Sequence, residues 1–272
     1  MIELKTGDNI NLILDLEDES IDCTVTSPPY NKKGIGGVLC HKIKYQHCDD
    51  NLPENEYQEQ QIKLLNIIFN KTQETGSLFY NHKVRYKNGN TISPWEWLTK
   101  TKWSIRQEII WNRGSGPEIS GYRFTQTDER IYWLCKGSKH PKLPRSSANL
   151  TSVWKFGPEN KNPHPAPYPI QLPVRCIQAV MTKPGLVFDP YSGSGTTGVV
   201  ATLLGHDYIG FDSSETYNTM AMQRISNPSE NDLKKFNKET EQKSVNVEKR
   251  NKQIQQTARR KRKFVNSEGL VN

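Results

Sequence analysis

The sequence of 272 residues predicts an α/β fold with a doubly wound, mostly parallel sheet. The first observation is that residues 185–212 read as strand, glycine-rich turn, helix and strand. Such βαβ units build parallel sheets through right-handed crossovers. The second is that β-branched runs and helical patterns alternate along residues 2–225, where the apolar residues cluster. We therefore expect one domain over residues 1–225, followed by a basic, partly disordered or helical tail over 226–272.

Hydrophobic periodicity locates the individual elements. Strands are expected at residues 2–8, 21–27, 76–82, 105–112 and 129–136, before the βαβ unit. Helices are expected at 9–18, at 54–75, from Pro94 onward, where a first-turn proline is tolerated, and at 170–181. The buried face of the second helix should carry Tyr57, Ile62, Leu65, Ile68 and Phe69. Residues 137–163 are polar with few regular signals, which predicts an insert within the domain.

The positive charge is concentrated at the C-terminal end. The formal net charge is +8, and residues 230–272 hold 12 Lys or Arg against 6 Asp or Glu. The densest run is ARRKRK, from Ala258 to Lys263. Clusters of this kind attract nucleic-acid phosphates through counterion release, although a solvated tail has the same composition.

The cysteines and the hydropathy exclude several classes of protein. Five scattered cysteines without a CxxC pair argue against a disulfide framework and against a metal site. Cys23 and Cys176 lie in apolar contexts and are expected in the core. No stretch approaches the roughly 18 apolar residues of a membrane span. The N-terminus lacks the plan of a signal peptide, so a cytoplasmic protein is expected.

The glycine-rich turn, VFDPYSGSGTTG, indicates a nucleoside cofactor. Gly193, Gly195 and Gly198 match the GxGxxG pattern between a strand and a helix. Asp212 ends the following strand, where a carboxylate can accept hydrogen bonds from ribose hydroxyls. The glycines alone allow NAD or S-adenosylmethionine. Asp189, at the end of the first strand, would repel a pyrophosphate and attract an ammonium group, which favours S-adenosylmethionine.

A second motif, TSPPYNKKGIGG, follows the strand at 21–27. Pro28 and Pro29 end the strand and fix the backbone in an extended turn. The pattern is typical of a strand that simply stops at a loop, or of a site whose backbone carbonyls must be held rigidly toward a substrate.

Together, TSPPY and FDPYSGSGTTG resemble the signatures of the amino-methylating DNA methyltransferases, which modify N4 of cytosine or N6 of adenine. Ser27 to Tyr30 match the catalytic [D/N/S]-PP-[Y/F/W], and Asp189 to Thr197 match the cofactor motif DPFxGSGTT. The catalytic motif precedes the cofactor motif, an order that resembles the permuted beta subgroup. The resemblance spans about residues 2–225 and implies the seven-stranded sheet of S-adenosylmethionine-dependent methyltransferases.

The resemblance also implies roles for individual residues. In the catalytic motif, the Ser27 hydroxyl and the Pro28 carbonyl would draw the amine hydrogens out of the base plane. Pro29 would hold the turn rigid and Tyr30 would stack on the flipped base. The methyl group would pass directly to nitrogen without a covalent enzyme intermediate. The expected cofactor-binding residues are Asp8, His164, Phe188, Asp189, Ser192, Gly193, Gly195, Thr196, Thr197 and Asp212.

The expected partner is double-stranded DNA. Target recognition is assigned to the insert at 137–163, with the loop 31–51. The predicted DNA-binding residues are Lys139, Lys142, Arg145, Arg259, Arg260 and Lys261. A restriction endonuclease as counterpart and a homodimer are options that the family allows.

Serine at the first catalytic position favours N4 of cytosine, with N6 of adenine as the alternative. Three other hypotheses stay open at this point. The chain could be a nicotinamide-dependent oxidoreductase, a DNA-binding protein without activity, or an amino-methylating enzyme that acts on RNA.

Overall fold

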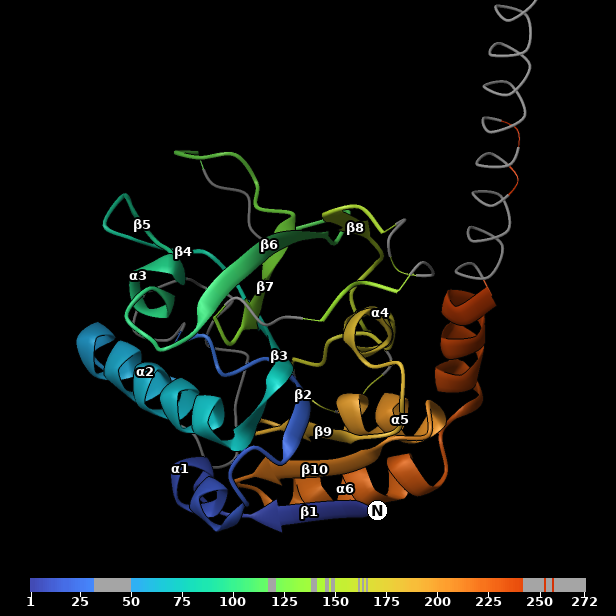
Figure 1. Ribbon diagram of the computed structural model, residues 1–272. Helices are drawn as coiled ribbons and strands as arrows, with labels where there is room; N and C mark the ends of the chain where they lie inside the picture. Colours follow the sequence, from blue (N-terminus) through green and yellow to red (C-terminus); the bar gives the residue numbers. More distant parts are fainter. Residues whose placement is uncertain are drawn as a thin grey trace, which may run out of the picture.

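A central sheet of eight strands organises the residues that the computed structural model describes, which are 1–31, 50–116, 121–137, 141–144, 147, 150–160, 162, 164, 166–241, 252 and 256. Its strand order is β1-β10-β9-β2-β3-β7-β6-β8 (Figure 1). The strands are β1 (Ile2–Thr6), β2 (Ile21–Thr26), β3 (Thr72–His82), β6 (Ser104–Asn112), β7 (Asp128–Cys135), β8 (Val153–Lys155), β9 (Leu186–Asp189) and β10 (Asp207–Asp212).

The sheet is mostly parallel, as expected. Pairing is parallel from β1 across to β3, antiparallel where β7 meets β3 and β6, and parallel again between β6 and β8. The prediction of seven strands is corrected to eight. The extra edge strand, β8, lies inside the polar insert, where three residues are too short to leave a periodic pattern.

Helices cover both faces of the sheet (Figure 1). One face carries α1 (Asn9–Leu12), the 3-10 turn η1 (Ile13–Asp15), α2 (Glu54–Lys71) and α3 (Trp95–Leu98). The other carries α4 (Gln171–Val180), α5 (Thr196–Leu203) and α6 (Glu215–Ser226). Successive strand residues point to opposite faces. Phe79 therefore joins the core under α4 and α5, whereas Leu78 and Tyr80 join the core under α2.

Two local boundaries differ from those expected. The helix predicted for 54–75 ends at Lys71, because Thr72 adopts extended backbone angles and pairs with Ile21 at the start of an 11-residue β3. A small hairpin, β4 (Arg85–Lys87) and β5 (Asn90–Ile92), was not expected. Its turn residues Asn88 and Gly89 both have positive φ, which Asn-Gly favours.

The start of the tail packs onto the domain. Residues 230–241 are helical, and Phe236 packs against the core under α4 and α5. Arg224 pairs with Asp232 through two nitrogens at 3.0 and 2.7 Å, and Arg175 pairs with Glu239 at 2.6 Å. The ordered body of the chain therefore extends to at least residue 241.

The expected core cysteines, Cys23 and Cys176, are fully buried. Burial raises the pKa of both thiols. Within the described part of the chain, no three His, Cys, Asp or Glu side chains are grouped so as to hold a metal ion. No helix there is both long enough and apolar enough to cross a bilayer.

Candidate active site

The site lies where the winding of the sheet reverses. From β2 the chain crosses through α2 on one face to β3, whereas from the adjacent strand β9 it crosses through α5 on the other face to β10. The loops after β2 and β9 therefore separate and leave a crevice at the carboxyl ends of these strands. A cavity of about 510 Å³ occupies this place. That is within the range of roughly 300–1,000 Å³ for small-molecule sites.

The crevice brings the two sequence motifs together. Ser27, Pro28, Pro29 and Tyr30 follow β2 and line one side of the cavity. The glycine-rich turn follows β9 and lines the other, through Gly193. A hydrogen bond of 2.8 Å from the Thr26 hydroxyl to the Asp189 carboxylate ties the two strand ends together.

A polar network that the sequence did not indicate holds the Ser27–Tyr30 turn. Asn81, at the end of β3, donates through Nδ2 to Ser27 Oγ at 3.2 Å and to Tyr30 Oη at 2.7 Å. Tyr30 Oη donates to Glu129 Oε2 at 2.9 Å, and Ser27 Oγ lies 2.9 Å from Tyr30 Oη. Arg113 binds the other oxygen of Glu129 at 2.8 Å. The serine and tyrosine of the motif are thus oriented by three neighbouring strands.

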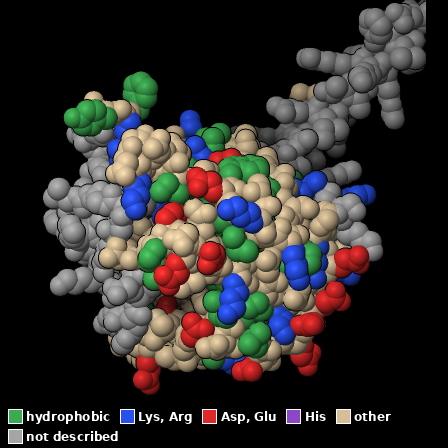
Figure 2. Space-filling model, turned by 90° about the vertical axis from the view of Figure 1, so that its left-hand side faces the viewer, with side chains coloured by type: hydrophobic (Ala, Val, Ile, Leu, Met, Phe, Trp, Pro, Cys, Tyr) green, Lys and Arg blue, Asp and Glu red, His purple; other side chains and the backbone are tan. Residues whose placement is uncertain are grey.

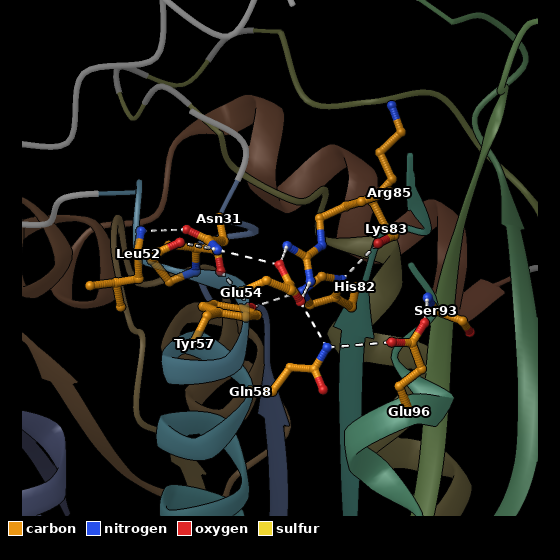
Figure 3. A network of polar contacts seen from close by, with 11 residues as sticks. Asn31, Leu52, Glu54, Tyr57, Gln58, His82, Lys83, Arg85, Ser93 and Glu96 are labelled. Carbon is orange, nitrogen blue, oxygen red and sulfur yellow. Dashed lines mark hydrogen bonds and ion pairs between the residues drawn. The ribbon is translucent and has the colours of Figure 1, made fainter. Parts of the chain in front are cut away.

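A second set of contacts supports the turn from below (Figure 3). Tyr57 on α2 donates its hydroxyl to the Pro29 carbonyl at 2.8 Å. Asn31, next to Tyr30, has a positive φ of 54°, and its amide exchanges hydrogen bonds of 2.7 and 2.9 Å with the Leu52 backbone. Glu54 and Arg85 form a bidentate ion pair beside it, with both contacts at 2.7 Å. Because a positive φ is uncommon outside glycine, these contacts hold a strained turn in place.

The glycine-turn side of the cavity combines Gly193, His164, Asp212 and Tyr217. A Cβ built on Gly193 would lie 3.0 Å from His164 Nε2, and its φ is +51°, so the space and the backbone both require glycine. Asp212 accepts the backbone N–H of Gly193 at 2.9 Å and that of Ser214 at 2.8 Å. A carboxylate has about four acceptor positions, so it can also take hydroxyl groups from a ligand.

Asp8 also reaches the cavity, but it has a structural task as well. Its side chain caps α1 by accepting the Asn11 N–H at 3.0 Å. Capping of α1 uses one carboxylate oxygen of Asp8, so it is compatible with the predicted ligand contact.

Six predicted cofactor residues lie behind the cavity wall: Phe188, Asp189, Ser192, Gly195, Thr196 and Thr197. Phe188 is core, on the α2 side of the sheet. Ser192 Oγ meets Tyr208 Oη at 2.9 Å, and Arg224 donates to the Thr196 hydroxyl at 2.8 Å. A Cβ on Gly195 would stand 2.8 Å from that of Ala221, so this glycine permits helix packing.

Asp189 has a structural role in place of the predicted contact with the cofactor. Its side chain is fully buried and accepts hydrogen bonds from Thr26, Tyr168, Thr197 and the Tyr191 N–H at 2.8–3.0 Å. Burial raises its pKa to about 6, against the opposing effect of these bonds. We therefore correct its predicted contact with an ammonium group: the carboxylate joins β2, β9 and α5 and does not line the cavity.

Most of the predicted DNA contacts lie outside the described residues, namely Lys139, Arg145, Arg259, Arg260 and Lys261. Lys142 is described and exposed. Among the tryptophans, Trp97, Trp103 and Trp111 are buried, whereas Trp95 is 40% exposed. Trp111 also lines the cavity.

His164 should make stability depend on pH. Burial lowers its pKa from 6.5 to about 4, so the folded protein keeps the ring neutral where an unfolded chain would protonate it. Its contribution to the free energy of unfolding should therefore fall as the pH drops from about 6.5 to about 4. Denaturant unfolding of the wild type and His164→Gln across this range would measure it. Parallel curves of unfolding free energy against pH for the two proteins would contradict the assignment. Asp189, whose raised pKa gives the opposite trend, is present in both proteins, so the difference between the curves reports His164 alone.

The fold and the cavity define an α/β protein of the methyltransferase type, in which the Ser27–Tyr30 turn and the glycine-rich turn share one cavity. Comparison with known proteins gives the family. The model of the family described as DNA methylase, N6_N4_Mtase, matches residues 21–223, and the chain belongs to this family of S-adenosylmethionine-dependent methyltransferases.

Individual proteins similar to this chain are methyltransferases as well. The chain is 28% identical to the type II methyltransferase M.SmaI of Serratia marcescens, over 80% of this chain and 89% of the relative. It is 29% identical to M.HpaI of Haemophilus parainfluenzae, over 79% and 71%. Among solved structures, the cytosine-N4-specific PvuII DNA methyltransferase matches with a TM-score of 0.66 at 19% identity, over 91% of this chain and 93% of that chain. A putative DNA modification methylase from Thermus thermophilus, complexed with S-adenosyl-L-methionine, gives 0.62 at 20%, over 83% and 93%.

Proposed function

We propose that this DNA methyltransferase transfers a methyl group to N4 of cytosine in duplex DNA. The observation that carries the proposal is the Ser27–Tyr30 turn, held in one cavity with Gly193 and Asp212. Serine at the first catalytic position supports cytosine over adenine. The similarity to the cytosine-N4-specific PvuII enzyme supports the same choice.

The residues that line the cavity fit the chemistry of S-adenosylmethionine. Gly193 leaves room beside His164 that any side chain would fill, and Asp212 offers acceptor positions for ribose hydroxyls. Asp8 stands at the same end of the cavity, suited to the adenine amine. When bound, S-adenosylmethionine supplies an electrophilic methyl group on a sulfonium.

The turn is built to activate a poor nucleophile. An exocyclic amine donates its lone pair into the ring, so it must be pyramidalised before it can attack. The Ser27 hydroxyl and the Pro28 carbonyl would accept its two N–H groups. Asn81, Glu129 and the two prolines keep these acceptors in place before the base arrives. Tyr30, fixed through its hydroxyl, would offer its ring to the base. After the nitrogen has accepted the methyl group, one of its protons leaves to solvent.

The direct test is transfer of labelled methyl from S-adenosylmethionine to mixed-sequence duplex DNA, followed by nucleoside digestion and mass spectrometry. N4-methylcytosine is the expected product. N6-methyladenine would retain the enzyme class and overturn the choice of base. Label in RNA alone, or bound cofactor with no methylated nucleoside, would overturn the function.

Removal of residues 242–272 should weaken DNA binding without altering the cofactor site. This segment has 9 Lys or Arg and 2 Asp or Glu, hence +7, and it excludes the packed helix at 230–241. Because phosphate contacts release counterions, the loss should be largest at low salt, and the dependence of log K on log salt should become shallower. Fluorescence anisotropy with a labelled duplex would measure it. An unchanged slope would leave the tail as a solvated segment.

A further inference from the structure

The connection between β6 and β7, residues 113–127, carries two aromatic side chains that project from the surface, and we call this connection the arm. Tyr122 and Phe124 are 101% and 99% exposed. The next most exposed large hydrophobic side chains among the described residues are Met1 at 69% and Leu14 at 59%. Single exposed apolar side chains are ordinary, but two fully exposed rings at alternate positions of one arm indicate a binding surface. Figure 2 shows hydrophobic side chains that project from an upper corner of the molecule.

The arm rises from the rim of the cavity. It joins the end of β6 to the start of β7, where Asn112 pairs with Asp128. Trp111 and Arg113 on one side, and Glu129 on the other, line the cavity. In Figure 1 the arm extends beyond the β4–β5 hairpin and the sheet. A base bound at Ser27 would therefore lie in the cavity from whose rim this arm extends.

The described residues of the arm are held by contacts at Arg113, Arg123 and Gln126. The Arg113 N–H donates to the Thr127 carbonyl at 2.8 Å. Gln126 Nε2 donates to the Val84 carbonyl at 3.2 Å, and the Arg123 guanidinium lies 4.6 Å from the centre of the Tyr86 ring. Contacts made before binding reduce the ordering cost on association. Arg123 lies between the two aromatic residues in the sequence and supplies a positive charge, suited to a phosphate.

We propose that Tyr122 and Phe124 insert into the DNA stack next to the base to be methylated. The inference rests on the proposed function, since it concerns the same cavity. When a base leaves the helix, its neighbours lose a stacking partner, and apolar or aromatic wedges can occupy unstacked steps. The rings replace that partner and so hold the flipped state, while Arg123 binds the adjacent backbone. The rings are fully exposed, so their replacement does not endanger folding.

The test compares the double variant Tyr122→Ala/Phe124→Ala with the wild type on two duplexes that contain the methylated sequence, mapped first with the wild type. In one duplex the target cytosine is paired with guanine. In the other it faces an abasic site, where little pairing is lost on flipping. We expect a loss of about tenfold or more in kcat/KM on the paired duplex and a much smaller loss on the other. Affinity for S-adenosylmethionine should not change.

Two further variants make the result specific. Tyr122→Phe/Phe124→Tyr keeps both rings and should retain wild-type rates. Met222→Ala/Leu233→Ala removes two other exposed apolar side chains, 38% and 36% exposed, and should also match the wild type. Unchanged rates for the alanine pair, or equal losses on both duplexes, would overturn the inference. A third outcome would also overturn it: the alanine pair changes the sedimentation coefficient of the protein but leaves the ratio of kcat/KM between the two duplexes at the wild-type value. The rings would then contact a second copy of the chain. A wild type that methylates no cytosine in the mapping step would refute the proposed function instead.

Discussion

Ser27→Ala should lower methyl transfer roughly 100- to 1,000-fold, the scale measured for loss of one preorganised polar group in an active site. The variant removes the side-chain acceptor that we propose for the amine. It should not unfold the turn, because Asn81 Nδ2 still has Tyr30 Oη at 2.7 Å and Glu129 Oε2 at 3.1 Å as acceptors. Pro28→Ala should fall in the same range, since it releases a fixed φ next to the second acceptor.

The measurement is kcat/KM with DNA, together with the Kd for S-adenosylmethionine from equilibrium dialysis. Cofactor affinity should stay at the wild-type value. Ser20→Ala is the matched control, because that hydroxyl donates to the Glu17 carbonyl and is absent from the cavity lining. Full activity of Ser27→Ala would remove the serine from the mechanism.

Glu129→Gln should reduce kcat about 10- to 100-fold, while the KM for DNA changes little. The carboxylate accepts from Tyr30, Asn81 and Arg113 at once, and its side chain is only 8% exposed. An amide in its place presents an N–H to groups that are themselves donors, so at least one contact is lost and the turn loosens. Hydrogen bonds to charged groups contribute about 1.5–3 kcal/mol, which corresponds to this range of rates.

Glu108→Gln provides the comparison for that variant. Glu108 also lies in the sheet and pairs with Arg130 at 2.7 Å, but it does not line the cavity. It should leave kcat unchanged. If Glu129→Gln changed stability by as much as Glu108→Gln and left kcat intact, Glu129 would be a structural residue only. A change confined to kcat would support its role in positioning Ser27 and Tyr30.

The sequence by itself determined the fold class, and it predicted the two local motifs that the structure brings together in one cavity. Strand-turn-helix order around Gly193 predicted the nucleoside pocket, and the two prolines after β2 predicted a rigid turn. These signals are local, since each depends on the conformational limits of a few adjacent residues. The Asn-Gly turn of the β4–β5 hairpin is a local signal of the same kind, although the hairpin was not predicted, whereas the three-residue β8 leaves no local signal.

Only the tertiary structure decided which residues act on the turn. Asn81 and Glu129 lie 54 and 102 residues beyond Ser27, and they meet it because Asn81 in β3 pairs with Ile131 in β7 beside the end of β2. The spacing of residues along the chain does not predict this register between β3 and β7. Burial likewise decided the role of Asp189: its place in the motif suits a ligand contact, but its oxygens are occupied by neighbouring strands and α5. Long-range pairing and desolvation are properties of the packed sheet, and local sequence patterns do not encode them.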